Sequence, residues 1–537
     1  MSHESRETAD VGLSVAMIVR DEQQVLADTL ESLNGLANEI VVADTGSSDD
    51  STQIARGHGA RVIETTWSDD FSAARNAALA ATRGRWVLWL DAGETLPKET
   101  AEWLREFVDS GPDATRACQL FVEVPPAISG AAPEQIAQVR LMPRLESPVF
   151  SGRVRETPRA ALLAAGLEIE STRWRIVRHR RDHDPEVKAA RARRNLELSR
   201  LEIEQHGLSP AMLTTRGEAF MALGERQQAA AAFYQALRLS RRGSTDMLEA
   251  YYGLLTTFAG DATDRDQQLA ICLEALEVFP LDAQLLCAMG NYLQAQDRLD
   301  LAARSFQAAT EHGAVEPDVW HLRGIRASAA ACLSLICQLQ GDHQRAESVL
   351  QSALERQGDA PQLRRHLIHL SIKRGRTEEA LEELERLPAE TPHREALRSA
   401  VRGACLVAQQ NAIPALAYLE TAYSAGCRDP LCLKWLFVAL VSAGREGEAE
   451  AILREWEEVE PAHPEIAQYR AAFSAAASAE LDDVPATPLD EDAVQVDSTA
   501  SDPQGPAKIR IDKADHRRTS SAPTQKSTAQ SPASARP

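Results

Sequence analysis

Short apolar runs alternate with amphipathic stretches over the first part of the chain. Four runs have the length and composition of buried strands, at residues 13–19, 39–43, 61–64 and 86–90. Between them, apolar residues recur at helical spacing in stretches that begin at Asp21, Asp50 and Ser72. Strands separated by helices of this length predict βαβ units and a parallel sheet. Because ligands bind such sheets at the carboxyl ends of the strands, we expect functional residues directly after each strand.

From residue 184 the pattern becomes helical and then repeats itself. Small and large residues recur in one frame, at Gly217, Phe220, Ala229, Phe233 and Ala236 and again at Gly290, Leu293, Ala302, Phe306 and Ala309. Later alanines keep the frame at intervals of 34, 35 and 34 residues, at Ala346, Ala380, Ala415 and Ala449. This spacing is typical of tetratricopeptide repeats. It predicts stacked helix pairs with a concave surface that suits peptides or extended chains.

The remaining segments complete a prediction of the domains. Residues 110–182 are less regular, with strand-like pieces at 117–124, 138–142 and 174–177. The last part is rich in Ala, Ser, Pro, Asp and Thr, a composition that cannot bury enough surface to fold. We therefore expect a flexible N-terminus (1–11), an α/β domain (12–183), a linking helix (184–205), an all-α tetratricopeptide-repeat solenoid (206–470) and a disordered tail (475–537).

The composition of the chain indicates which classes of binding partner and which cellular compartment it fits. The 537 residues carry a net charge of -21, which argues against nucleic acid because phosphate binding needs a basic face. A nucleotide held through a metal ion stays compatible with that charge. No stretch reaches the roughly 20 apolar residues of a membrane span, and the polar start lacks the apolar segment of a signal peptide. Eight scattered cysteines without metal-binding spacing favour reduced thiols, so we expect a cytoplasmic protein.

Polar residues follow three of the predicted strands. They are Arg20-Asp21-Glu22, Asp44-Thr45-Gly46-Ser47 and Asp91-Ala92-Gly93-Glu94. A nucleoside diphosphate needs a carboxylate for the base or ribose, a close backbone turn and a divalent cation. Asp44 with Gly46 suits the first two needs, and Asp91 suits the third. Each aspartate also has a plainer interpretation, since Asp21, Asp49 or Asp50 could only cap a helix and Asp91 could only end a strand.

Three longer segments carry a family resemblance. They read SVAMIVRDEQQVLADTLESL, EIVVADTGSSDDSTQIA and DDFSAARNAALAATRGRWVLWLDAGE. Together they resemble family 2 glycosyltransferases of the GT-A fold, especially the branch with tetratricopeptide repeats behind the catalytic domain, which includes peptide S-glycosyltransferases. The resemblance covers about residues 12–205, and the repeats extend it to about 470. It implies an inverting transfer of a sugar from a nucleotide-diphosphate donor to a protein, peptide or glycan acceptor positioned by the repeats.

The resemblance also assigns a donor site. Val19, Arg20 and Glu22 would meet the nucleobase and ribose. Asp44 would hold the base or ribose, with Gly46 and Ser47 forming its turn. Arg75 and Asn76 belong to the family's F-S-x-A-R-N element, which places Arg75 toward the sugar or phosphate. The alternative is that Arg75 and Asn76 only tie a helix to the sheet.

The resemblance further implies a metal site and a base, each with a departure. Asp91 matches the first aspartate of a D-x-D motif, but this chain has Gly93 where the family has the second. Asp91 with Glu94 and His179 would hold Mg²⁺ or Mn²⁺, or else the metal site is lost. Glu156 would be the general base of the transfer. It ends a segment that resembles G-x-I-H-E, with Arg155 in place of the histidine.

Plainer roles remain open for two of these residues and for the whole chain. Glu156 could be a surface glutamate in a turn, and His179 could be structural. The leading hypothesis is a metal-dependent glycosyltransferase of the hexosyltransferase type, whose repeats select the acceptor and leave donor binding untouched. The alternative is a catalytically impaired scaffold that acts through its repeats. Nucleotidyl transfer is disfavoured because no glycine-rich phosphate loop with a lysine is present.

Overall fold

The computed structural model describes the chain with a few gaps. Described are residues 12–126, 132–146, 148–259, 265–357, 360–388, 391, 393–459, 466 and 469–471, with the backbone alone at 181 and 182. The expected flexible N-terminus and disordered tail lie outside these residues. The described residues all fall within one unit, Met1–Ala486. None of their helices is long and apolar enough to cross a membrane.

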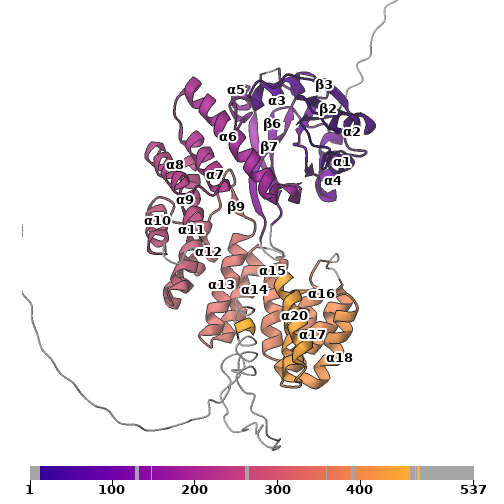
Figure 1. Ribbon diagram of the computed structural model, residues 1–537, viewed down its shortest axis with the longest axis vertical. Helices are drawn as coiled ribbons and strands as arrows, with labels where there is room; N and C mark the ends of the chain where they lie inside the picture. Colours follow the sequence, from indigo (N-terminus) through magenta and orange to yellow (C-terminus); the bar gives the residue numbers. More distant parts are fainter. Residues whose placement is uncertain are drawn as a thin grey trace, which may run out of the picture. The chain divides into compact units, whose positions relative to one another are not determined.

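The N-terminal domain is built on a sheet whose first four strands are parallel (Figure 1). β1 (Leu13–Val19) lies between β2 (Glu39–Asp44) and β4 (Trp86–Trp89), and β3 (Arg61–Glu64) pairs with β2. These strands match the four predicted apolar runs. Alternate side chains of β1 enter two different apolar clusters, one with α1 (Leu26–Glu31) and α4 (Lys98–Asp109) and one with α3 (Phe71–Ala80). Helices therefore cover both faces, which is why the strands read as continuous apolar runs.

The rest of the sheet is mixed rather than parallel. Its order is β3-β2-β1-β4-β7-β6-β8-β5, in which the later strands are β5 (Glu94–Thr95), β6 (Arg116–Val124), β7 (Glu134–Pro143) and β8 (Glu168–Arg178). β7 runs antiparallel to both β4 and β6, because β6 and β7 follow each other without a crossover helix. β5 pairs with β8 immediately after the Asp91 turn. The acidic turn is thus fixed between β4 and β8.

Short helices connect the strands of this domain. They are α1 (Leu26–Glu31), α2 (Ser51–Gly57), α3 (Phe71–Ala80), α4 (Lys98–Asp109) and α5 (Arg159–Ala164). Asp70 is the N-cap of α3, and its side chain accepts a hydrogen bond from the Ala73 N–H at 3.0 Å. Asp21 does not cap the first helix. It has a φ of 55°, and its Oδ1 accepts from the Ser48 N–H at 2.7 Å, so it joins two loops at the strand ends.

A series of antiparallel helices follows (Figure 1). They are α6 (Pro185–His206), α7 (Pro210–Ala222), α8 (Arg226–Leu239), α9 (Thr245–Phe258), α10 (Arg265–Val278), α11 (Ala283–Ala295), α12 (Leu299–His312), α13 (Ile325–Leu339), α14 (His343–Gln357), α15 (Pro361–Lys373), α16 (Thr377–Glu385), α17 (Arg394–Ala408), α18 (Ala412–Ser424), α19 (Pro430–Ser442) and α20 (Glu446–Val459). Each packs against the next, as in a repeat solenoid. The predicted succession of an α/β domain and a helical-repeat solenoid is confirmed.

The repeat frame has a direct packing explanation. The four anchoring alanines, Ala346, Ala380, Ala415 and Ala449, are fully buried. Gly290 lies against the ring of Phe306, where an added Cβ would come within 2.6 Å of ring atoms. A small residue at this position is what lets the aromatic ring enter between the helices of a pair.

One segment of the repeats leaves the solenoid and joins the sheet. Between α12 and α13, the short strand β9 (His321–Leu322) pairs antiparallel with β7. The carbonyl of Pro317 accepts a hydrogen bond from the Ala137 N–H at 2.7 Å. We call residues 313–324 the docking segment. The spacing pattern predicts no such element.

Candidate active site

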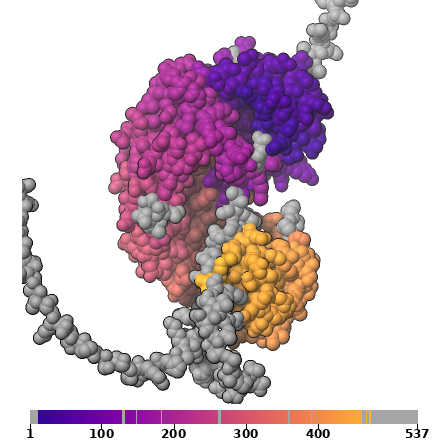
Figure 2. Space-filling view, in the orientation of Figure 1, coloured from indigo at the N-terminus to yellow at the C-terminus, as the bar shows by residue number. Residues whose placement is uncertain are grey.

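A cavity of about 1050 Å³ opens at the carboxyl ends of the parallel strands. One wall comes from the residues after β1, β2 and β4, and another from α6. The repeats supply a third wall with Glu218, Thr245 and Glu249 from α7 and α9, and with Asp318 and Trp320 from the docking segment. In Figure 2 the first of these helices (magenta) lie directly against the N-terminal domain (indigo). The cavity therefore belongs to both domains.

Arg75 organises the centre of this cavity. Its Nη1 lies 3.0 Å from Oδ1 of Asp91, and its Nη2 lies 2.5 Å from Oε1 of Glu156. Its guanidinium also lies over the Trp89 ring, 4.5 Å from the centroid. Because one planar cation binds both carboxylates, the strand end and the distant Glu156 are held at a fixed separation.

Three arginines keep Asp91 ionised. Burial acts to raise the pKa of Asp91, but Arg75, Arg140 and Arg178 outweigh it and hold that pKa well below its usual range. For Arg75 burial acts in the opposite sense, and Asp91 and Glu156 overcome it to raise the pKa of the guanidinium. The pair is charged at neutral pH.

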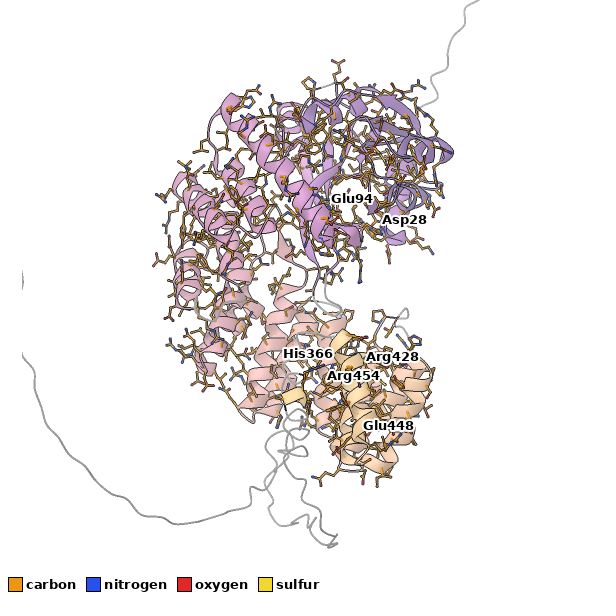
Figure 3. The ribbon with its side chains drawn as sticks, in the orientation of Figure 1. Asp28, Glu94, His366, Arg428, Glu448 and Arg454 are labelled. Carbon is orange, nitrogen blue, oxygen red and sulfur yellow. The ribbon has the colours of Figure 1, made fainter. Side chains whose placement is uncertain are left out.

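Glu94, which is labelled in Figure 3, is deeply buried and pairs with Arg140 and Arg178. It is 1% exposed, and Arg140, which it meets at 2.9 Å, is 4% exposed. Its Oε1 also accepts from Nε of Arg178 at 3.3 Å, and its Oε2 accepts from the Asp91 N–H at 2.9 Å. Removing one partner of so deeply buried a pair typically costs about 3–5 kcal/mol. Glu94 thus holds the turn after β4 in shape.

The residues at this turn do not fit a divalent cation. Both carboxylate oxygens of Asp91 accept hydrogen bonds. Oδ1 accepts from the N–H groups of Trp89 and Arg75, and Oδ2 accepts from an N–H group of Arg140. Both oxygens of Glu94 are engaged as well. In the described part of the chain, no group of three or more His, Cys, Asp or Glu side chains is arranged to hold a metal ion. Asp91, Glu94 and His179 therefore do not form the metal-binding group that the resemblance implied.

Gly93 is built into the same turn by its backbone. It has a φ of 86°, a conformation that favours glycine. Its N–H donates to Oγ1 of Thr29 at 2.9 Å, and its carbonyl accepts from the His179 N–H at 2.7 Å. A Cβ at this position would lie 3.3 Å from a Val25 methyl group. The second aspartate of a D-x-D motif has no unstrained place here.

The expected donor residues divide into two sets. Val19, Arg20, Glu22 and Arg75 line the cavity together with Asp91, Glu94 and Glu156. Asp44, Gly46, Ser47, Asn76 and His179 are not among the lining residues. The carboxylate of Asp44 is engaged by its own turn, accepting from the N–H groups of Gly46 and Ser47 at 3.2 Å and from the Ser47 hydroxyl at 2.5 Å.

Asn76 binds the loop that precedes Glu156. Its Oδ1 accepts from the N–H groups of Val149 and Phe150 at 2.8 and 2.9 Å, and its Nδ2 donates to the Phe150 carbonyl at 2.9 Å. These bonds fix the start of the segment that leads to Glu156. The two adjacent residues of this motif therefore have different roles. Arg75 lies in the cavity, and Asn76 stabilises the loop that leads to Glu156.

The repeats hold the Glu156 loop through Arg155. Nη1 of Arg155 lies 2.7 Å from Glu249 on α9, and Nη2 lies 3.2 Å from Glu218 on α7. Burial acts to lower the pKa of Arg155, but the two glutamates overcome it and raise that pKa. Next to it, Val154 packs against Leu198 of α6 and Met212 of α7. The arginine that replaces the family's histidine thus connects the loop to the repeats.

The docking segment closes the other side of the cavity. Asp318 accepts from Nε2 of Gln119 at 2.6 Å and pairs with Arg159 at 2.7 Å. A length signal marks this segment, because Ala302 and Ala346 are 44 residues apart (346 − 302), against 34 between Ala346 and Ala380. The ten extra residues could have indicated an insertion, but not its contact with the sheet.

α6 contributes a wall of the cavity that carries arginines. From the sequence this helix was expected only to link the two domains. Arg191 and Arg194 line the cavity from this helix, as Arg20 does from the end of β1. The guanidinium of Arg194 lies over the Phe71 ring, 4.8 Å from the centroid. Desolvation and the nearby Arg191 and Arg20 lower the pKa of Arg194, while the carboxylates of Glu156 and Glu22 act in the opposite sense without overcoming them. This wall of the cavity therefore combines arginines with the carboxylates of Glu22 and Glu156.

Two segments of the chain match known families. Residues 14–124 match the sequence profile of glycosyl transferase family 2, and residues 339–402 match a tetratricopeptide repeat. The chain carries a family 2 glycosyltransferase domain and tetratricopeptide repeats. The first match covers β2, β3, β4, all but the first residue of β1, and the turn at Asp91, and it ends at the last residue of β6. The resemblance drawn from the sequence is confirmed.

Curated relatives match over limited lengths. A TPR repeat-containing protein of Synechococcus elongatus is 47% identical over 97 residues, which are 18% of this chain and 24% of that protein. The glycosyltransferase SunS of the Bacillus subtilis SPbeta prophage is 27% identical over 152 residues, 27% of this chain and 34% of SunS. An uncharacterized glycosyltransferase of Rickettsia typhi is 31% identical over 87 residues, 16% and 30% of the two chains. The chain thus spans about a quarter to a third of the length of these relatives.

Two solved structures are similar to parts of the chain at low TM-scores. Glucosyl-3-phosphoglycerate synthase of Mycobacterium tuberculosis, solved with Mn²⁺, uridine diphosphate and glucosyl-3-phosphoglycerate, is 24% identical with a TM-score of 0.18, covering 20% of this chain and 43% of that one. Yeast Tom70 is 14% identical with a TM-score of 0.35, covering 56% and 61%.

Proposed function

We propose that this protein is an inverting glycosyltransferase that uses a nucleotide-diphosphate sugar. The observation that carries the proposal is the arrangement of Asp91, Arg75 and Glu156. A carboxylate at the end of the fourth strand and a second, distant carboxylate are held by one arginine in a cavity of the family 2 domain. That arrangement provides a base at a fixed distance from the strand ends, where the donor binds.

In the proposed reaction Glu156 is the general base. The acceptor's oxygen, sulfur or nitrogen attacks the anomeric carbon while Glu156 takes its proton. The bond from the anomeric carbon to the diphosphate oxygen breaks, and its electron pair leaves with the nucleoside diphosphate. Arg75 holds Oε1 of Glu156, which leaves Oε2 to receive the proton. Direct displacement inverts the anomeric centre and needs no covalent intermediate.

The donor occupies the strand-end wall of the cavity. Val19, Arg20 and Glu22 contact the nucleobase and ribose of a uridine or guanosine diphosphate sugar. Asp44 shapes the turn that lets the nucleotide approach. The eight cysteines are free thiols, which suits the reducing cytoplasm, where we place the reaction.

The acceptor enters from the side of the repeats. Glu218, Glu249 and Trp320 reach the cavity from α7, α9 and the docking segment, so an acceptor bound by the repeats comes directly to Glu156. We propose a protein, peptide or glycan acceptor, because a solenoid surface binds extended chains.

A donor screen tests this proposal on the full-length protein. Nucleotide-diphosphate sugars are offered one at a time with Mg²⁺, with Mn²⁺ and with EDTA, and release of the nucleoside diphosphate is measured. The expected result is turnover of one donor class, reduced about 100-fold or more in Glu156→Gln. The matched control, exposed Glu168→Gln, should equal the wild type.

A second candidate function is a scaffold that acts through its repeats. The ion pairs from Arg155 to the repeats favour it, because they show that a departure from the family motif has a structural use. No turnover and no binding of any nucleoside diphosphate would contradict the enzyme and leave the scaffold as the remaining candidate.

A further inference from the structure

The docking segment is held by both domains at once. Val319 is buried in the apolar core of the repeats. His321 is buried against the sheet, where Nε2 of Gln135 lies 3.0 Å from its Nε2 and Phe121 makes an edge-to-face contact with its ring. The backbone of Trp320, which lies between Val319 and His321, is therefore fixed from both sides.

The side chain of Trp320 belongs to the cavity. It lines the cavity together with Asp318, whereas Val319 and His321 are buried, so alternate side chains of this extended segment point to opposite sides. The ring is partly exposed, and the guanidinium of Arg178 lies over it, 5.8 Å from the centroid. The repeats thus present one large aromatic surface to the cavity at a fixed place.

This aromatic surface lies on the side of the sheet away from the nucleotide wall. Arg20 and Glu22 follow β1, which lies between β2 and β4. The docking segment contacts β7, β6 and β8, which come after β4 in the order of the sheet. A donor bound at the ends of the parallel strands leaves this side of the cavity to the acceptor.

The helices next to Trp320 can lead an extended acceptor into the cavity. α7 packs against α9 as well as against α8, so α7 and α9 form one continuous surface. Glu218 on α7 and Glu249 on α9 line the cavity, which means that this surface ends there. An extended chain that lies along α7 and α9 therefore arrives between Trp320 and Glu156.

The polar groups beside the ring are engaged with one another. Asp318 pairs with Arg159 at 2.7 Å and accepts from Gln119 at 2.6 Å, and Arg178 pairs with Glu94 at 3.3 Å. A sugar in contact with the ring would need hydrogen-bonding partners for its hydroxyl groups. An apolar side chain needs none, and an indole ring offers it a large rigid surface. The surroundings of Trp320 favour a peptide over a glycan.

We propose that Trp320 determines acceptor specificity by packing against an apolar side chain of a peptide, next to the residue that receives the sugar. This inference rests on the proposed function and narrows its acceptor to a peptide. Trp320 takes no part in the transfer itself. It holds the peptide so that the attacking atom lies at Glu156.

The test uses the full-length protein, the donor identified by the screen and a panel of synthetic peptides. Each peptide carries a central Cys, Ser or Asn, flanked by Leu, Phe, Gly or Glu. The wild type should use peptides with flanking Leu or Phe with a kcat/KM about tenfold or more above that of the Gly peptides. Trp320→Ala should raise the KM for these peptides about tenfold and remove the preference, whereas Trp320→Phe should keep most of it.

Hydrolysis of the donor by water separates acceptor binding from donor binding. Its rate should stay within about twofold of the wild type in both Trp320 variants, because the residue lies outside the nucleotide wall. The matched control is Val315→Ala, which changes an exposed apolar residue of the same docking segment outside the cavity lining. This variant should equal the wild type in both assays.

Three results would overturn the inference and leave the proposed function standing. They are equal use of Leu and Gly peptides by the wild type, an unchanged peptide KM in Trp320→Ala, and donor hydrolysis without transfer to any peptide. Equal loss of hydrolysis and transfer in a folded Trp320→Ala would assign the residue to the donor instead. No turnover of any donor by the wild type contradicts the proposed function as well. The comparison of flanking residues needs the wild type alone, so it decides the question even where a variant fails to fold.

Discussion

The contact between the repeats and the Glu156 loop leads to the most specific prediction. Glu249 lies on α9, 94 residues along the chain from Arg155, and its carboxylate is 2.7 Å from that guanidinium. Glu249→Gln keeps the size of the side chain and removes its charge. Arg155 then retains Glu218, which is half exposed. The loop should lose its firmest connection to the repeats.

The magnitude follows from the burial of the pair. Arg155 is 25% exposed and Glu249 is 13% exposed, which places the pair between a surface ion pair and a buried one. Removing the charge should lower the free energy of unfolding by about 1–3 kcal/mol. If the contact also positions Glu156, kcat should fall about 5- to 100-fold, since 1.4 kcal/mol corresponds to about tenfold. The KM for the donor should change little, because Arg155 is not part of the donor wall.

A double-mutant cycle with Arg155→Ala measures this coupling. Rates of donor turnover and urea unfolding curves are recorded for the wild type, both single variants and the double variant. The matched control is Glu204→Gln, which breaks the exposed pair with Arg200 on α6 and should change stability by only about 0.5 kcal/mol. Coupling seen in stability but not in kcat would refute the claim that the repeats position the base.

Three further predictions concern the turn at Gly93, the repeat frame and acid stability. Gly93→Asp should destabilise the protein by about 1–3 kcal/mol, because φ is 86° there, and a Mn²⁺ titration should show no gain in metal affinity. Gly290→Ala should cost about 1–3 kcal/mol by crowding the ring of Phe306, whereas Gly447→Ala, with open space around its Cα, should be neutral or stabilising in thermal unfolding. Burial acts to raise the pKa of Asp91, but the neighbouring arginines outweigh it and lower that pKa. The lowered pKa stabilises the folded protein above about pH 4, the usual pKa of an aspartate, and this stabilisation is lost as the pH falls through the pKa of Asp91 in the folded protein. The difference in unfolding free energy between wild type and Asp91→Asn, about 2 kcal/mol at neutral pH, should therefore shrink on acidification.

The strands and helices that could be predicted from the sequence are those whose packing follows from residues close together in the chain. β1 and β4 are apolar runs that are buried along almost all of their length, β2 is buried over its last four residues, and β3 is partly buried. The repeat frame reflects contacts such as that of Gly290 with Phe306. Asp91 and Glu156 were identified because the motifs around them resemble a family. Their common partner Arg75 was found in the same way, although its ion pairs with both could not be read from spacing.

The contacts between the two domains could not be predicted, because they join residues far apart in the chain. Neither the docking of β9 on β7 nor the pairing of Arg155 with Glu249 leaves a periodic signal. Nor does the amphipathic pattern of α6 tell which of its arginines face a cavity. Both domains line the cavity, and that the repeats leave donor binding untouched stays a prediction.

The central claim is that Glu156, held by Arg75, is the base of a sugar transfer. The most direct measurement compares wild type and Glu156→Gln with the donor identified by the screen, recording both turnover and the Kd of the nucleoside diphosphate. The account predicts a loss of about 100-fold or more in kcat and a Kd within about threefold of the wild type. A Glu156→Gln variant that turns over the donor at the wild-type rate would contradict it.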